Sequence, residues 1–103
     1  MVNIDIYDNP KDFSIFARVK ILSRTEKALN LSKEDNQEEA IQIYTNLIEM
    51  IEWQEDIYVN RGIAFYEIWE KDLAIADFKK AILLNPTNSL ALSFLGEILQ
   101  EKD

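Results

Sequence analysis

The side chains best suited to acid–base chemistry in this sequence are neighbouring carboxylates. They occur at Glu34–Asp35, at Glu38–Glu39 and, more widely spaced, at Asp5 and Asp8. A catalytic pair needs burial and a shared substrate site, so that the two pKa values separate. These acids fall instead where the sequence predicts a turn, a helix start and an extended arm, and carboxylates there act as caps and favour the helix dipole. The sequence therefore predicts structural roles for them.

Other reactive side chains are equally sparse. The chain has no His and no Cys, which excludes imidazole acid–base pairs, Ser-His triads, disulfides and zinc sites built on those ligands. No glycine-rich phosphate loop and no calcium-loop pattern occurs. Tyr44 and Tyr66 are assigned to core or groove packing. The sequence predicts no catalytic residue, no metal and no cofactor, and hence a protein that is not an enzyme.

The charge balance limits the partners. The net charge of −8 opposes the phosphates of nucleic acids and anionic membrane surfaces, so neither is an expected partner. Residues 1–10 lack the basic start and apolar run of a signal peptide. No stretch of about 20 apolar residues is present to span a membrane. A cytoplasmic location is expected by default, and the acidic surface serves either solubility or the recognition of a basic partner.

The elements that position these residues follow from an internal repeat. Five residues recur at a constant spacing of 34: Ala28, Leu31, Ala40, Tyr44 and Leu47 return as Gly62, Phe65, Ala74, Phe78 and Ala81. A third copy begins, because Tyr58 and Gly62 return as Leu92 and Gly96. A fixed period of this length indicates stacked copies of one supersecondary unit.

The second copy, residues 56–88, resembles a tetratricopeptide repeat, which is a helix–turn–helix unit of about 34 residues. With the repeat beginning at Glu55, the family's signature positions hold Tyr58, Gly62, Phe65, Ala74, Phe78, Ala81 and Pro86. Arg61 departs from the family, which usually has Leu there, and the first copy has Arg24 and Lys27 where apolar residues are expected. The resemblance covers roughly residues 21–102 and implies a right-handed stack of antiparallel helix pairs.

The predicted fold class is therefore all-α, with about two and a half repeats. An extended arm is expected over residues 1–9 and one helical domain over 10–103, divided into repeats at about 21–54, 55–88 and, in part, 89–103. Five helices are predicted, at about 10–32, 37–53, 55–69, 71–84 and 88–102. The first is expected to be continuous, although Ser23 and Glu26 could form a capping box that divides it.

The same spacing predicts the core. Ala74, Phe78 and Ala81 fall on one face of the fourth helix, and Gly62 lets the third helix approach it closely. The fifth helix is expected to use the equivalent face against the fourth, through Leu92, Leu95, Gly96 and Leu99. Phe94 and Ile98 would then remain on an open face. Trp69, in the turn after the third helix, either covers the edge of the core or is an exposed contact residue.

The resemblance also implies a concave groove lined by the first helix of each pair. Its residues here would be Leu22, Leu29, Val59, Ile63, Tyr66, Glu67, Leu90 and Glu97, an apolar centre beside an acidic rim that Glu101 extends. Chaperone-binding relatives grip a C-terminal carboxylate with Lys, Arg and Asn on this face. The corresponding positions are Thr25, Leu29, Asn60, Leu90 and Phe94. Only Asn60 is of the required type, which predicts that this clamp is missing.

The predicted function is a non-enzymatic adaptor or scaffold that holds a peptide or protein in this groove. One alternative is a self-associating structural unit, a homodimer formed through Phe94 and Ile98. Another is a small acidic inhibitor or immunity-like protein that blocks a basic target. Whether the arm of residues 1–9 fills the groove stays open at this stage.

Overall fold

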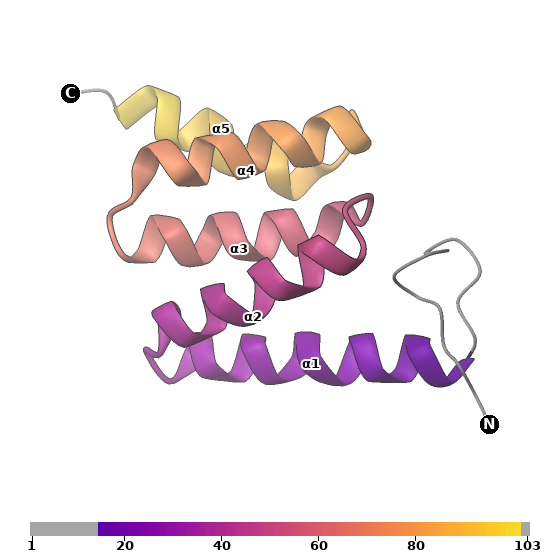
Figure 1. The fold of residues 1–103 in the computed structure, drawn as a ribbon. Coiled ribbons are helices and arrows are strands. Elements are labelled where there is room, and N and C mark those ends of the chain that lie inside the picture. Colours follow the sequence, from indigo (N-terminus) through magenta and orange to yellow (C-terminus); the bar gives the residue numbers. More distant parts are fainter. Residues whose placement is uncertain (1–14, 102–103) are drawn as a thin grey trace.

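The computed structural model describes residues 15–101, and within this range it is all-α, as predicted. The helices are α1 (Ile15–Lys33), α2 (Gln37–Met50), α3 (Glu55–Glu67), α4 (Lys71–Leu84) and α5 (Ser89–Glu101) (Figure 1). The predicted arm and the predicted helix start at Pro10 lie outside the described residues. The helix α1 is continuous through Ser23 and Glu26, so no capping box divides it.

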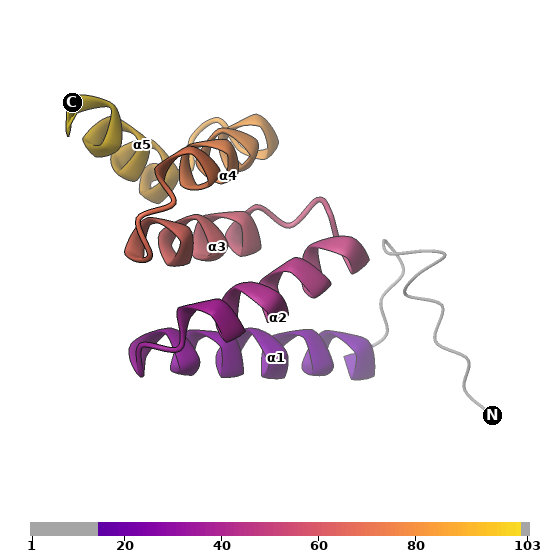
Figure 2. The same cartoon turned by 60° about the vertical axis from the view of Figure 1, so that its left-hand side comes forward.

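The helices stack in chain order. Each helix contacts the next one along the chain, and α3 also contacts α1 and α5 directly. Two views of the ribbon show the same succession from α1 at one end to α4 and α5 at the other (Figures 1 and 2). Contacts between neighbouring units alone are the pattern of a repeat stack, in which each helix pair completes its core against the next.

The 34-residue period is visible in the backbone as well. Asp35 and Trp69, one period apart, both have left-handed φ angles, of 67° and 68°. In each case the following N–H donates to a carbonyl in the last turn of the helix, from Asn36 to Leu31 at 2.7 Å and from Glu70 to Phe65 at 2.9 Å. Both helices thus end with the same left-handed turn. This conformation costs about 1–2 kcal/mol for a residue with a side chain.

The second helix is shorter than predicted, because it ends at Met50. Ile51 leaves helical geometry, and its side chain is completely buried in the core. Its N–H still donates to the carbonyl of Leu47 at 2.8 Å. The loop that follows is held by the Tyr58 hydroxyl, which donates to the carbonyl of Glu52 at 3.0 Å. Burial of one apolar residue outside the helix explains the earlier end.

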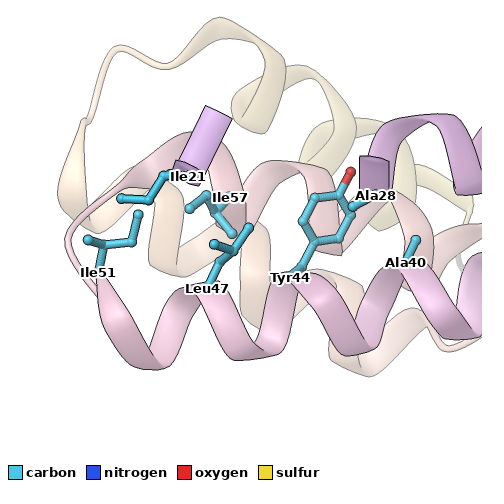
Figure 3. Packing of buried hydrophobic residues seen from close by; sticks show 7 residues of the cluster. All are labelled: Ile21, Ala28, Ala40, Tyr44, Leu47, Ile51 and Ile57. Atoms are coloured by element: carbon cyan, nitrogen blue, oxygen red, sulfur yellow. The ribbon is translucent and has the colours of Figure 1, made fainter. Parts of the chain in front are cut away.

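The first core cluster joins α1, α2 and the start of α3. Its buried members are Ile21, Ala28, Ala40, Tyr44, Leu47, Ile51 and Ile57 (Figure 3). The repeat predicted four of them, and these four are fully buried. Figure 3 shows the Tyr44 ring beside Ala28, so the small residue on α1 accommodates the large one on α2. This complementarity is how the first helix pair is closed.

Tyr44 has a polar atom in this apolar cluster. Its hydroxyl is buried and has no hydrogen-bond partner among the described residues, and burial raises the pKa of Tyr44 to about 12. An unsatisfied buried polar group costs about 1–3 kcal/mol. Tyr44→Phe is therefore expected to raise the free energy of unfolding by about 1 kcal/mol or more at pH 7, measured by urea unfolding.

The raised pKa also sets a pH dependence. The folded-state pKa of Tyr44 lies above the value of about 10 in unfolded chains. The contribution of Tyr44 ionisation to the free energy of unfolding is therefore constant below pH 10. Stability is then lost as the pH rises from about 10 to 12, where only the unfolded state ionises. Tyr44→Phe should lack that part of the alkaline loss. A parent protein as stable as the variant at both pH 7 and pH 11 would contradict this account.

The second core cluster is built around the contact between α3 and α4. Ala74, Phe78 and Ala81 are fully buried, as the spacing predicted. A Cβ atom added to Gly62 would lie 2.9 Å from Cε1 of Phe78, which is closer than packed carbon atoms approach. The predicted close approach at Gly62 is confirmed.

The orientation of α5 differs from the prediction. It packs against α4 through Ala91, Phe94 and Ile98, and the Phe94 ring stacks on Phe78 with centroids 5.4 Å apart. Ile98 is only 4% exposed. Phe94 and Ile98 are therefore part of the core, and the prediction that they form an exposed self-association surface is wrong. The cause is that α5 begins a new repeat, so it meets α4 as α3 meets α2.

Candidate interaction surface

The first helices of the repeats lie together on one side of the stack, because α3 contacts both α1 and α5. Leu22 and Leu29 project from α1 two turns apart, on one stripe. Leu22 is 67% exposed, and Leu29 and Leu90 are also exposed. Three of the predicted groove residues are thus exposed.

The central helix contributes less than predicted. Ile63 and Tyr66 are half-buried and pack against the second core cluster. Val59 is 2% exposed and belongs to that cluster, so its predicted place in the groove is wrong. Because α3 has neighbours on both sides of the stack, more of its circumference is covered than that of α1 or α5.

The acidic residues of the predicted rim divide into two kinds. Glu67 and Glu97 are exposed on α3 and α5. Glu101 is engaged: Lys71 Nζ lies 2.8 Å from its Oε1, and the Tyr66 hydroxyl donates to its Oε2. These two partners hold the pKa of Glu101 below its ordinary value. Glu101 therefore fixes the end of α5 to α3 and α4.

Arg61, the departure from the family pattern, is an internal clamp. Its guanidinium donates twice to Asp77 on α4, from Nε at 2.8 Å and from Nη2 at 2.7 Å. A third bond goes to Oγ1 of Thr45 on α2 at 3.1 Å, and the Phe65 ring lies beneath the guanidinium, 5.5 Å away. Burial raises the pKa of Asp77, against the opposing effect of Arg61. An Arg at an apolar repeat position implied an acidic partner, and this signal was missed.

The acid pairs Glu34–Asp35 and Glu38–Glu39 do not converge on a site, and Asp5 and Asp8 lie outside the described residues. Glu34, Asp35, Glu38 and Glu39 are exposed in the turn before α2 and in its first turn. In residues 15–101, no three acids, His or Cys are grouped as metal ligands. No helix in that range is long and apolar enough to cross a membrane. The positions of Glu34, Asp35, Glu38 and Glu39 match the structural role that the sequence predicts.

Trp69 lies in the turn between α3 and α4 with 84% of its surface exposed. Of the two predicted roles, a cover over the core edge is wrong, and the residue is an exposed one. Its left-handed backbone adds strain to this exposure.

Comparison with known proteins supports the reading of the repeat. No protein-family model matches the chain, and no curated protein matches it. Among solved structures, it is similar to the second TPR of Spaghetti (RPAP3) bound to HSP90 peptide SRMEEVD, with 28% sequence identity and a TM-score of 0.68. The match covers 78% of this chain and 83% of that chain. Together with the 34-residue period and the stacked helix pairs, this likeness shows that the chain has a tetratricopeptide-repeat-like fold.

Proposed function

We propose that this chain is a non-enzymatic protein-binding module that holds an apolar, basic peptide segment along α1, α3 and α5. The observation that carries the proposal is the exposure of Leu22 and Leu29 on α1 and of Leu90 on α5, the two helices that flank α3. Exposed apolar side chains do not add to the stability of a monomer, and a group of them on one surface favours the binding of a partner. The exposed glutamates Glu67 on α3 and Glu97 on α5, the latter two turns after Leu90, select its charge.

The two parts of this surface contribute differently. Burying an exposed Leu side chain stabilises a complex by up to about 1.5–3 kcal/mol. The exposed acids contribute mainly to the rate of encounter and to the choice of partner. The preferred ligand therefore has apolar residues that reach Leu22 and Leu29, flanked by Lys or Arg.

This ligand class differs from that of the similar solved structure, which holds the HSP90 peptide SRMEEVD. That peptide carries more acidic than basic side chains, and here it would approach Glu67 and Glu97. The clamp positions of chaperone-binding relatives hold Thr25, Leu29 and Leu90 in this chain, which offer no cation. Like charges across an interface suppress the wrong partner.

A matched pair of peptides tests this preference. SRMEEVD should bind at least tenfold more weakly than SRMKKVK, in which Lys replaces each acidic residue, measured by fluorescence anisotropy at low salt. Added salt should weaken the binding of SRMKKVK, because the acids are exposed and screened. Equal or tighter binding of SRMEEVD would contradict the proposed ligand class.

A pair of double variants tests the location. Leu22→Asn with Leu29→Asn should reduce the affinity for the basic peptide at least tenfold. Leu73→Asn with Leu83→Asn removes two exposed leucines from α4, outside the proposed surface, and should leave the affinity unchanged. Exposed positions of this kind alter stability little, so all these proteins should stay folded. Equal losses in the two double variants would place the ligand elsewhere.

A further inference from the structure

The helix α1 differs from the rest of the chain in charge. It carries five of the eleven cationic side chains and one of the nineteen acidic ones, in a protein whose net charge is −8. Two of these cations, Arg24 and Lys27, occupy repeat positions where apolar residues are expected. The proposed function does not use them, because they lie on the side of α1 opposite to Leu22 and Leu29.

Arg24 and Lys27 line a cleft between α1 and α2. The cleft has a volume of about 320 Å³, and its other lining residues are Ile43, Asn46 and Leu47 on α2. Arg24, Lys27 and Asn46 are exposed, whereas Ile43 is half-buried and Leu47 is fully buried. Within the described part of the chain, neither cation has an ion pair or a side-chain hydrogen bond. Two cations and an amide therefore surround an apolar floor.

The repeat shows which group such a cation contacts. One period later, Lys27 corresponds to Arg61 and Ile43 corresponds to Asp77. The Arg61 guanidinium donates to both carboxylate oxygens of Asp77, at 2.8 and 2.7 Å. The first copy keeps the cation but has isoleucine in place of the acid. The carboxylate that completes the same contact must therefore come from outside this helix pair.

The surroundings of the cleft limit the size of the anion. A neighbouring hollow that shares Lys27 is also lined by Glu26 and Glu34. Surface charges are screened beyond about 8–10 Å, so a short acidic segment responds mainly to the cations of α1. A nucleic acid, or a second copy that itself carries −8, would extend to the remaining acids and be repelled.

The apolar floor limits the chemistry of the anion as well. Ile43 and Leu47 offer a surface on which methylene groups can pack. A carboxylate on an aliphatic stem, as in glutamate, uses this floor and the cations together. Inorganic phosphate has no apolar part to bury, so it uses the cations alone.

We propose that the cleft between α1 and α2 binds a glutamate side chain from a short acidic segment of a partner protein. The carboxylate accepts charge-assisted hydrogen bonds from Arg24 and Lys27 and a further bond from the Asn46 amide, while its methylene groups pack on Ile43. The site goes beyond the proposed function and is independent of it, because the apolar surface with Leu22 lies on another side of α1.

The probe is the tetrapeptide acetyl-Ala-Glu-Glu-Ala-amide, titrated at low salt into the isotope-labelled full chain. It should shift the NMR signals of Arg24, Lys27 and Asn46, including the side-chain amide of Asn46. The matched peptide with Gln in place of each Glu should bind at least tenfold more weakly, and so should sodium phosphate at the same ionic strength. Equal binding of either one, or shifts centred on Leu22 and Leu90 instead, would overturn the proposal.

Two double variants of equal charge test the location. Arg24→Gln with Lys27→Gln should abolish binding of the Glu peptide. Lys79→Gln with Lys80→Gln removes the same charge from exposed positions on α4 and should leave the affinity within about twofold. All four positions are exposed, so both variants should stay folded. Equal losses in the two variants would show that only the net charge matters, which would contradict a site in the cleft.

The comparison between repeats has a test of its own at Ile43. Ile43→Asp supplies the carboxylate from within the chain, as Asp77 does for Arg61, and should abolish binding of the Glu peptide. Ile43→Asn has the same shape without the charge and should retain binding. Retained binding in a folded Ile43→Asp variant would contradict the equivalence of Lys27 and Arg61.

Three further measurements exclude other occupants. Asp5, Asp8 and Asp12 lie outside the described residues, and replacing all three with Asn should leave the affinity unchanged. Binding at least tenfold tighter after that change would assign the cleft to this segment of the chain. A parent dimer at low salt that Arg24→Gln with Lys27→Gln dissociates would assign it to a second copy. A single-stranded oligonucleotide that shifts the same signals at lower concentration than the Glu peptide would assign it to nucleic acid.

Discussion

Replacing Arg61 with Leu is expected to lower the free energy of unfolding by about 3–5 kcal/mol, even though Leu is the usual residue at this repeat position. The change leaves Asp77 buried without its guanidinium partner. Burial already raises the pKa of Asp77, and Arg61 is the group that opposes this effect. A loss of this size is a large fraction of the stability of a small domain, so urea unfolding should show it clearly.

The control is the double variant Arg61→Leu with Asp77→Leu. Replacing both partners of a buried pair with apolar residues is often neutral or stabilising. The double variant should therefore recover most or all of the stability that Arg61→Leu loses. If the single variant is as stable as the parent, or the double variant is no better than the single, the ion pair is not what joins α3 to α4.

The two glycines are expected to respond in opposite directions to the same change. Gly62→Leu should lower the free energy of unfolding by about 3 kcal/mol, because even its Cβ would meet the Phe78 ring at 2.9 Å and Cβ of Asp77 at 3.2 Å. Gly96→Leu should raise it by about 1 kcal/mol, since Gly is a poor helix former and the added atoms enter open space.

Thermal or urea unfolding of these two variants, measured in parallel, checks the pair. Both glycines occupy the same repeat position, so a comparison of sequence alone predicts the same response. A loss of similar size in both would show that α5 is covered at Gly96 in the free protein. A gain in both would show that α3 and α4 are not packed as closely as Gly62 and Phe78 indicate.

The repeat period predicted most of the core, because positions that are small in one copy are small in the next, and the large ring of Tyr44 returns as that of Phe78. Ala28 and Tyr44 in the first pair and Ala74 and Phe78 in the second are all fully buried. The period does not say which neighbours a helix has. The pattern therefore predicted the wrong buried face for α5, because that face is set by contact with α4. It also placed Val59 in the groove, although α3 lies in the middle of the stack and Val59 is buried there.

The repeat pattern could not predict features that depend on a single atom or on a backbone angle. Trp69 adopts a left-handed conformation in the turn, and because it is not a glycine its residue type does not predict this conformation. The hydroxyl of Tyr44 is buried without a hydrogen-bond partner among the described residues. Leu22 and Leu29 are exposed, as expected for the groove positions that the family resemblance implies on α1.

The most direct test of the proposed function is selection from a random peptide library on the parent protein. The selected peptides should combine apolar residues with Lys or Arg, and their affinity should fall at least tenfold for Leu22→Asn with Leu29→Asn, while the Leu73→Asn with Leu83→Asn control keeps it. Peptides rich in acids, or peptides that bind both double variants as tightly as the parent, would contradict a ligand held along α1, α3 and α5.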